Sequence, residues 1–314
     1  MSKAYKGQIT NKVVELTLQD EQEFKTPTIV WSSTNGEIDQ VQGDIPDNWK
    51  NTDTSLKQLQ IGSSCTSIGS NAFYYCDGLT GSLVIPDSVT TIGDYAFNMS
   101  FGGDSWSGPL TIGNSVETIG SYAFRYCFGF DGSLTIPDSV TTIGSFAFYY
   151  CQGFNGSLTI PNSVTSIGSY AFGGCPGLTS LTIGNGVTTI GDNAFTEYSG
   201  TNNYSGDLII PDSVTTIGSY AFYITAGNFD KLVVGSGVTS IGSYVFGYNL
   251  TPVAYASCPA SAFVGSVAFY QCSSLTTLYA RDAVANGYTL GSQSFEGATL
   301  TVANWDNYPN PIPN

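Results

Sequence analysis

Residues 134–154 read LTIPDSVTTIGSFAFYYCQGF, and residues 158–178 repeat them almost unchanged as LTIPNSVTSIGSYAFGGCPGL. In the first copy Leu134 and Ile136 alternate with Thr135, as in a short strand with one buried face. A proline followed by Asp or Asn then predicts a turn. A second apolar pair and an aromatic segment complete the unit. Such a unit is too small to bury its apolar side chains alone, so it must stack on its neighbours.

The unit recurs along most of the chain and is recognised by the phenylalanine of Ile-Gly-x-x-Ala-Phe. Successive phenylalanines lie 23 to 27 residues apart, at Phe73, Phe97, Phe124, Phe148, Phe172, Phe195, Phe222, Phe246, Phe269 and Phe295. This period predicts a β-rich solenoid of about ten turns with the phenylalanines in its core. We expect the Leu-x-Ile strands to form one parallel sheet and the Ala-Phe segments to form short helical or 3-10 turns on the convex side.

The repeated pattern Leu-x-Ile-Pro-x-x-Val-x-x-Ile-Gly-x-x-Ala-Phe-x-x-Cys resembles the BspA-type leucine-rich repeat over residues 56–302. The resemblance implies a leucine-rich repeat solenoid. It also implies attachment to proteins or glycans, because these repeats are typical of microbial surface proteins, and it carries over no catalytic residue. The last turns depart from the pattern at Val245, Val264 and Ser294. Beyond them, the prolines of residues 303–314 predict an extended tail.

Residues 1–55 lack the repeat. Two strand-like runs at 28–31 and 38–41 flank the dipeptide Asn35-Gly36, which is a strong hairpin signal. We predict that residues 1–55 form a small β domain that caps the solenoid, because an uncovered end would expose core and sheet edges. The same domain is the candidate for attachment to a parent assembly.

The composition excludes several classes of function. The chain has 9 Lys and Arg against 24 Asp and Glu, a net charge of −15, and no histidine. Histidine-dependent catalysis and histidine-ligated zinc are therefore excluded. The few cations also argue against nucleic acid and anionic glycans. We predict no enzyme activity, no cofactor and no metal, and a partner that is a protein or a neutral glycan.

The sequence shows no hydrophobic signal core at its start and no apolar run of the roughly 18 to 20 residues that span a membrane. It therefore predicts no membrane insertion. The expected location is a virion or cell surface reached without the Sec route, or otherwise the cytoplasm. The expected function is non-enzymatic attachment, as in a phage decoration or receptor-binding subunit. A purely structural virion or envelope subunit and an ice-binding solenoid stay open as alternatives, and so does the oligomeric state.

Two turns are three residues longer than their neighbours, and both insertions follow the Ala-Phe segment, at residues 101–108 and 197–206. Insertions at one repeat position emerge on one edge, so these segments predict neighbouring recognition loops. Aromatic and acidic side chains on them suit a protein or sugar partner: Asp104, Trp106, Glu197, Tyr198 and Tyr204. The alternative is that a solenoid tolerates loop growth without a function.

Three columns of side chains recur at fixed repeat positions. An aromatic column could form a carbohydrate platform or docking face, or simply pack together: Tyr95, Tyr122, Tyr170, Tyr220 and Tyr244. A cysteine column could form disulfides or bind metal, although the odd total of seven favours buried packing: Cys76, Cys127, Cys151, Cys175 and Cys272. An Asp/Asn column could bind calcium, although we favour turn residues that bond their own backbone: Asp87, Asn114, Asp138, Asn162, Asn185 and Asp212.

Overall fold

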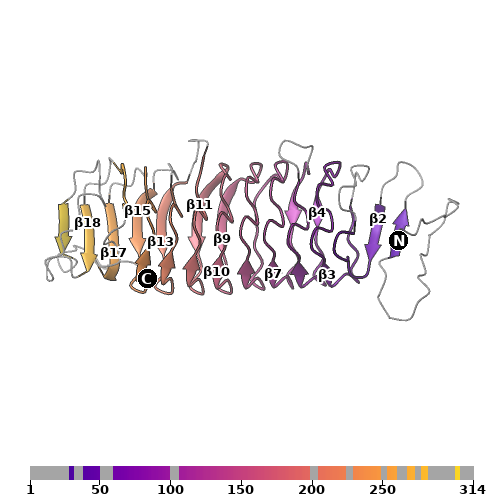
Figure 1. Ribbon diagram of the computed structural model, residues 1–314, viewed down its shortest axis with the longest axis horizontal. Helices are drawn as coiled ribbons and strands as arrows, with labels where there is room; N and C mark the ends of the chain where they lie inside the picture. The colour runs from indigo at the N-terminus through magenta and orange to yellow at the C-terminus, as the bar shows by residue number, and fades with distance from the viewer. Residues whose placement is uncertain are drawn as a thin grey trace, which may run out of the picture.

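The structure is a computed structural model, and it shows a long parallel β-solenoid whose turns stack side by side (Figure 1). It describes residues 28–31, 38–49, 59–99, 106–198, 204–223, 229–248, 253–259, 267–272, 277–281 and 301–304. Each turn has three successive segments, which we call its sides. The first side carries the Leu-x-Ile strand, the second the Thr-Ile pair, and the third the Tyr-Ala-Phe segment and the cysteine.

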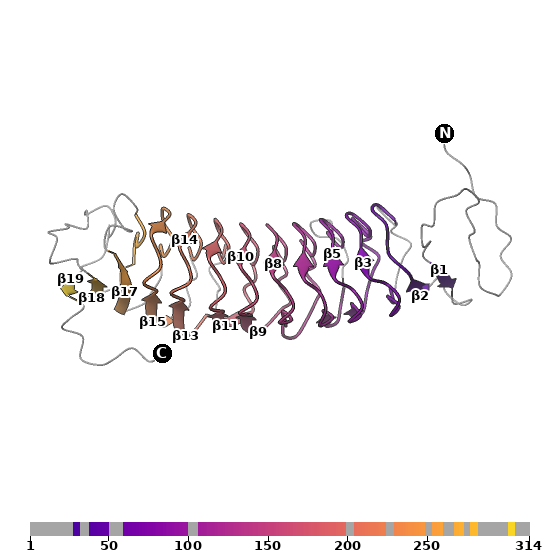
Figure 2. The ribbon, with the colours of Figure 1, turned by 90° about the horizontal axis from the view of Figure 1, so that it is seen from below.

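The second side forms the longest sheet, an eight-stranded parallel sheet that runs along the rod (Figure 2). Between neighbouring strands each isoleucine pairs with an isoleucine, and each Ser or Thr with a Ser or Thr. This register is constant because each of these turns has the same number of residues between its proline or glycine corner and Ile-Gly. The strands are β3 (Ser67–Ile68), β5 (Thr91–Ile92), β7 (Thr118–Ile119), β8 (Thr142–Ile143), β10 (Ser166–Ile167), β12 (Thr189–Ile190), β14 (Thr216–Ile217) and β16 (Ser240–Ile241).

The first side is divided into three parallel sheets, so the prediction of one sheet is wrong. They comprise β4 (Leu83–Val84) with β6 (Leu110–Thr111), β9 (Gly156–Ile160) with β11 (Leu178–Ile183), and the five strands β13 (Gly206–Ile210), β15 (Phe229–Val234), β17 (Val253–Pro259), β18 (Thr277–Arg281) and β19 (Thr301–Asn304). Residues 134–136 form no strand. Both longer turns insert their extra residues just before this side and lie next to a break in it. β4 and β6 pair across the first insertion, whereas β11 and β13, which flank the second, belong to different sheets.

The third side contains turns but no helix in the described part of the chain, so the predicted helical or 3-10 turns are wrong. Its amides alternate between two kinds of partner. Tyr122 and Phe124 donate to carbonyls of the next turn, each at 2.8 Å, whereas Ala123 and Arg125 donate to carbonyls three residues back. Tyr122 also has a φ of 60°. A residue in this left-handed region ends a right-handed helix.

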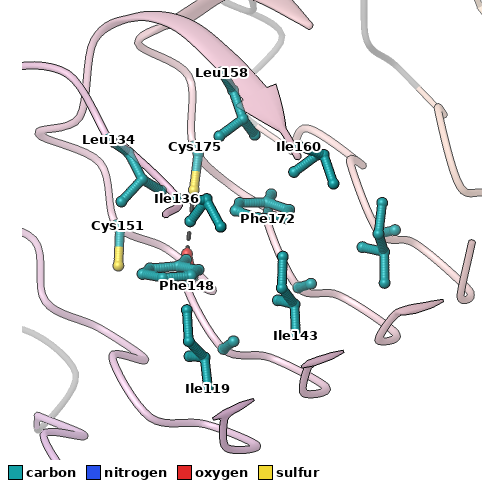
Figure 3. Packing of buried hydrophobic residues seen from close by; sticks show 14 of the residues in the cluster. Ile119, Leu134, Ile136, Ile143, Phe148, Cys151, Leu158, Ile160, Phe172 and Cys175 are labelled. Atoms are coloured by element: carbon teal, nitrogen blue, oxygen red, sulfur yellow. Dashed lines mark hydrogen bonds between the residues drawn. The ribbon is translucent and has the colours of Figure 1, made fainter. Parts of the chain in front are cut away.

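The core is a column of phenylalanine rings, as the repeat predicts (Figure 3). From Phe73 to Phe269 each ring stacks on the next at 5.1 to 5.7 Å between centroids. Leu, Ile and Val from the first and second sides surround these rings. Phe295 lies outside the described residues. The core therefore has no internal boundary between turns, because each ring belongs to two ring contacts.

The N-terminal segment covers the first turn. Strands β1 (Thr28–Trp31) and β2 (Ile38–Gln42) pair antiparallel, as a hairpin requires, although the Asn35-Gly36 dipeptide lies outside the described residues. Ile45 is buried and forms a parallel bridge with Ile68, and Trp49 packs edge-on against Phe73 at 5.6 Å. The division at residue 55 and the attachment role stay predictions. At the other end β19 reaches Asn304, and residues 305–314 lie outside the described part.

Candidate functional site

The predicted aromatic column forms an ordered ladder on the third side. Tyr95, Tyr122, Phe146 and Tyr170 stack at 4.5, 4.6 and 4.5 Å between centroids, with ring planes within 8° of parallel. After an interruption at Asn193, the predicted residues Tyr220 and Tyr244 stack at 5.0 Å. All of these rings are half-buried. Because neighbours cover each other's faces, the ladder presents ring edges and hydroxyls to solvent. Its role as a carbohydrate platform or docking face stays a prediction.

A left-handed backbone conformation places these rings. Tyr95, Tyr122, Tyr170, Tyr220 and Tyr244 have φ between 57° and 60°. Such a conformation costs a residue with a side chain on the order of 1–3 kcal/mol. The amide bonds to the next turn and the ring stacking, about 0.5 to 1.5 kcal/mol per pair, offset that cost. The ladder therefore exists only while the turns are stacked.

A second row of tyrosines flanks the ladder, and the sequence analysis did not single it out. These residues lie one or two positions after the core phenylalanine: Tyr74, Tyr75, Tyr126, Tyr149, Tyr150, Tyr223, Tyr248 and Tyr270. Tyr149 illustrates the packing, since it meets Phe146 at 5.2 Å and Tyr170 at 5.8 Å, edge-on in both cases. The signal was present in the repeated Phe-Tyr-Tyr-Cys. We call the ladder, this row and Tyr198 the tyrosine face.

The flanking row is interrupted by Gly173 and Gly174. A Cβ atom there would lie 3.2 Å from the Tyr149 ring and 2.9 Å from the Tyr150 ring, so glycine makes room for both rings. Tyr198 stacks on Tyr150 at 5.9 Å and is 44% exposed. Burial, followed by the neighbouring tyrosines, raises the pKa of Tyr149 to about 12. The hydroxyl, a hydrogen-bond donor at neutral pH as in any tyrosine, therefore stays protonated to a higher pH than usual.

Arg125 lies within the tyrosine face. Its Cζ atom is 4.1 Å from the Tyr126 ring centroid and 5.5 Å from that of Tyr122, and Nη2 donates to the Tyr126 hydroxyl at 2.7 Å. No ion pair joins Arg125 to another described residue. The guanidinium is held by aromatic rings instead, an interaction of about 0.5 to 2 kcal/mol. The face therefore combines ring edges, hydroxyls and one cation.

The predicted recognition loops are placed differently from the expectation. Trp106 and Tyr204 are buried rather than projecting, and they stack on Phe130 at 5.4 Å and Phe229 at 5.8 Å. The prediction that they are exposed anchors is therefore wrong. Both lie four residues before the first leucine of a strand, the same position as Phe130 before Leu134. That spacing could have shown their place in the core.

The other three loop residues have separate outcomes. Glu197 is buried at 3% exposure, and its Oε1 atom accepts a hydrogen bond from the Tyr198 amide at 2.9 Å. Tyr198 is exposed and belongs to the tyrosine face. Asp104 lies outside the described residues. Of the five loop candidates, the structure thus brings only Tyr198 to the surface among those that it describes.

The cysteine column is packing rather than a disulfide ladder. The six cysteines whose side chains the structure describes are buried and form no disulfide with one another. Each thiol of the column below donates to the carbonyl of a core phenylalanine of the preceding turn (Figure 3): Cys127 at 3.2 Å, Cys151 at 3.0 Å, Cys175 at 3.2 Å and Cys272 at 2.9 Å. Burial raises the pKa of the Cys175 thiol to about 12. Within the described ranges, no cluster of three or more His, Cys, Asp or Glu could hold a metal.

We expect reductant to leave the melting temperature unchanged, because the folded state uses thiols and not disulfides. Cys151→Ala should cost about 1 kcal/mol of unfolding free energy, since it removes one weak hydrogen bond and little volume. Thermal unfolding monitored by circular dichroism, with and without reductant, measures both effects. Mass spectrometry that found Cys127 joined to Cys151 in native protein would contradict the expectation.

The Asp/Asn column also bonds from turn to turn, as do threonines of the second side. Asp87, Asn162 and Asp212 accept from the amide at the corresponding corner of the next turn, at 2.6 to 2.7 Å. They are turn residues, but the expectation that they bond their own backbone is wrong. On the second side, Thr165 and Thr188 donate their hydroxyls to carbonyls of the preceding turn at 3.2 and 3.0 Å. An ice-binding array would need these donors free.

The stacked turns, the phenylalanine core and the side-chain bonds between turns define a leucine-rich repeat solenoid, a fold that generally serves as a non-enzymatic binding scaffold. The pattern described as "BspA type Leucine rich repeat region" matches residues 44–129, 117–252 and 202–310. The chain belongs to this family. In the described part of the chain, no helix is long and apolar enough to cross a membrane.

Two solved structures share the fold. A leucine-rich repeat protein from Bacteroides ovatus is 22% identical, with 83% of this chain and 77% of that chain covered and a TM-score of 0.52. The pneumococcal vaccine antigen PcpA is 16% identical, with 83% and 67% covered and a TM-score of 0.51. No curated protein sequence matches the chain. At these identities the likeness concerns the fold alone.

Proposed function

We propose that this chain is a non-enzymatic attachment protein that binds a protein or a neutral glycan on a target surface. The observation that carries the proposal is the tyrosine face, which collects hydroxyls, ring edges and Arg125 along one side of a rod of repeated turns. Tyrosine and arginine are the side chains most often found at the energetic centre of protein interfaces. Family membership supports a binding role.

The charge of the solenoid supports a neutral or basic partner. Beyond Lys57 the chain holds three cations and fifteen acids. Such a field raises the association rate of a basic partner and repels an acidic one. In this proposal the N-terminal segment holds the protein on a virion or cell surface, and the solenoid extends away from it. The tyrosine face is then displayed along the rod.

The test replaces Tyr198 and Tyr248, the members of the tyrosine face that are exposed, by serine in one variant. We expect a loss of attachment of about tenfold or more, the scale of an interface hot spot, with a melting temperature close to that of the parent. Binding is measured on an array of neutral glycans and on immobilised basic peptides. Val84→Ser is the control, because Val84 is 54% exposed on the first side. If the double variant binds as well as the parent, the tyrosine face is not the recognition surface.

A further inference from the structure

The first side opens where the second long turn enters it. The β9–β11 pair and the β13–β15 pair each form a parallel ladder with one register shift near its start, but β11 and β13 belong to different sheets. Near their start the Ser205 amide donates to the Thr179 carbonyl at 2.8 Å. The ladder then stops before the segments 181–183 and 208–210. Beyond this bond, β11 and β13 form no ladder with each other.

A hollow of about 420 Å³ lies at this opening. Its lining comes from β9, β11 and β13 and from the corners that follow the first side, and it includes Asp138, Thr159, Asn162, Thr182, Asn185 and Ile209. Small-molecule sites occupy about 300 to 1,000 Å³, so the hollow has the size of a site for one small ligand. It lies on a different side of the solenoid from the tyrosine face.

Hydrogen-bonding groups in the hollow are left uncommitted. On the second side the threonine hydroxyls donate to carbonyls of the preceding turn. In the hollow, by contrast, the hydroxyls of Thr159 and Thr182 have no hydrogen-bond partner among the described residues. The same holds for the side chains of Asp138 and Asn185, whereas Asn162 Oδ1 accepts from the Asn185 amide. These side chains are exposed, so a ligand in the hollow could bond to them.

An aliphatic side chain borders these polar groups. Ile209 is 46% exposed, which is unusual for isoleucine in this chain, and it lies in the hollow beside Asp207. Asp207 is already paired with Lys231 at 3.4 Å. Of the two carboxylates that line the hollow, Asp138 therefore has no cationic partner among the described residues. One carboxylate is too few for calcium, which prefers six to eight oxygen ligands and several negative charges.

We propose that this hollow binds a neutral sugar ring. A pyranose has hydroxyls that both donate and accept, and it has an apolar C–H face. Asp138 accepts from sugar hydroxyls, the amide of Asn185 and the hydroxyls of Thr159 and Thr182 donate and accept, and Ile209 covers the C–H face. The proposal does not depend on the tyrosine face, because no residue of that face lines the hollow.

The repeat supplies a matched control. Thr182 and Asn185 occupy the same positions in their turn as Thr111 and Asn114 in an earlier turn, and both corners begin with Gly-Asn. Thr111 and Asn114 are exposed but do not line the hollow. The test variant is Thr182→Val with Asn185→Ala, and the control is Thr111→Val with Asn114→Ala. Because the substitutions are identical, a difference between the two isolates the hollow.

The full chain is titrated with D-glucose, D-galactose and N-acetyl-D-glucosamine and followed by saturation-transfer NMR and calorimetry. We expect the parent and the control to bind at least one sugar, and the test variant to bind it about tenfold more weakly, as the loss of two hydrogen-bonding groups predicts. The variant with serine at Tyr198 and Tyr248 should bind the sugar like the parent. Sugar binding and target attachment of this variant are measured separately. Either proposal can therefore fail while the other holds.

Several results would overturn the proposal. One is a parent protein that binds none of the three sugars. Another is equal affinity of the test and control variants, which would place the sugar elsewhere. Loss of sugar binding in the tyrosine variant alone would move the site to the tyrosine face. The last is a parent protein that binds no sugar but binds a lysine-rich peptide or Ca²⁺, with that binding weakened in the test variant. Such a result would assign the hollow to a cation instead.

Discussion

Phe148→Ala is expected to lower the free energy of unfolding by about 3–5 kcal/mol, the range measured for phenylalanine truncation in protein cores. Phe148 is fully buried and stacks between Phe124 at 5.2 Å and Phe172 at 5.4 Å. It also meets Phe154 edge-on at 6.3 Å. Truncation would leave a cavity that weakens the contacts of two neighbouring turns at once. Urea unfolding followed by circular dichroism measures the loss.

Phe269→Ala is the matched control near the C-terminal end. Among the described rings, Phe269 stacks on Phe246 at 5.2 Å with planes 25° apart, less parallel than in the middle of the column. We expect a smaller loss, because stability in a repeat protein depends on contacts with both neighbours. Equal losses for the two variants would contradict the continuous phenylalanine core.

Gly144→Ala should cost about 3 kcal/mol or more, because it forces two turns apart. A Cβ atom at Gly144 would lie 2.5 Å from the Ser121 amide nitrogen and 2.6 Å from the Gly120 carbonyl carbon. Backbone atoms cannot move aside as a flexible side chain can, so overpacking here is costly. The same close approach recurs at the glycine after the second-side isoleucine in neighbouring turns, as at Gly168. Thermal unfolding of the purified variant measures the effect.

Gly132→Ala distinguishes the two reasons for a glycine, a steric clash between turns and a backbone with positive φ. Gly132 has a φ of 76°, yet a Cβ atom there would meet nothing within 4 Å. Its replacement should cost only about 1–2 kcal/mol, the penalty of a left-handed conformation. If Gly132→Ala destabilises the protein as much as Gly144→Ala, steric contact between turns is not what selects glycine after the isoleucine.

The repeat predicted those features of the fold that depend on period alone. Phe148 and its equivalents occur at one position in every turn, so their burial in one column followed directly. The division of the first side could not be predicted in the same way, because an insertion alone does not decide pairing. β4 and β6 pair across the first insertion, whereas β11 and β13 do not pair across the second. The pattern of residues 134–136 is the same as that of β9, yet only β9 forms a ladder.

The candidate site was predicted in part. Tyr122 and its equivalents were placed in one column, but their left-handed backbone and face-to-face stacking arise from contacts that form only between turns. The polar surroundings of Trp106 suggested an exposed loop. Its distance of four residues from Leu110 matches the buried Phe130 instead. The hollow had no sequence signal, since its lining comes from several turns that only the stacking of the solenoid brings together. Sequence patterns indicate which groups recur, and the structure shows which of them remain unbonded.

The side chains that bond from one turn to the next have a consequence for how the protein can change its length. Cys151 donates to Phe124 and Asn162 accepts from Asn185, so turns of similar sequence offer their neighbours matching donors and acceptors. Recombination between nearly identical repeats can therefore add or remove a whole turn without creating a new kind of interface. Each such event changes the reach of the rod by about one strand spacing, roughly 4.8 Å. Lineages can in this way tune how far a binding surface extends while leaving its chemistry unchanged.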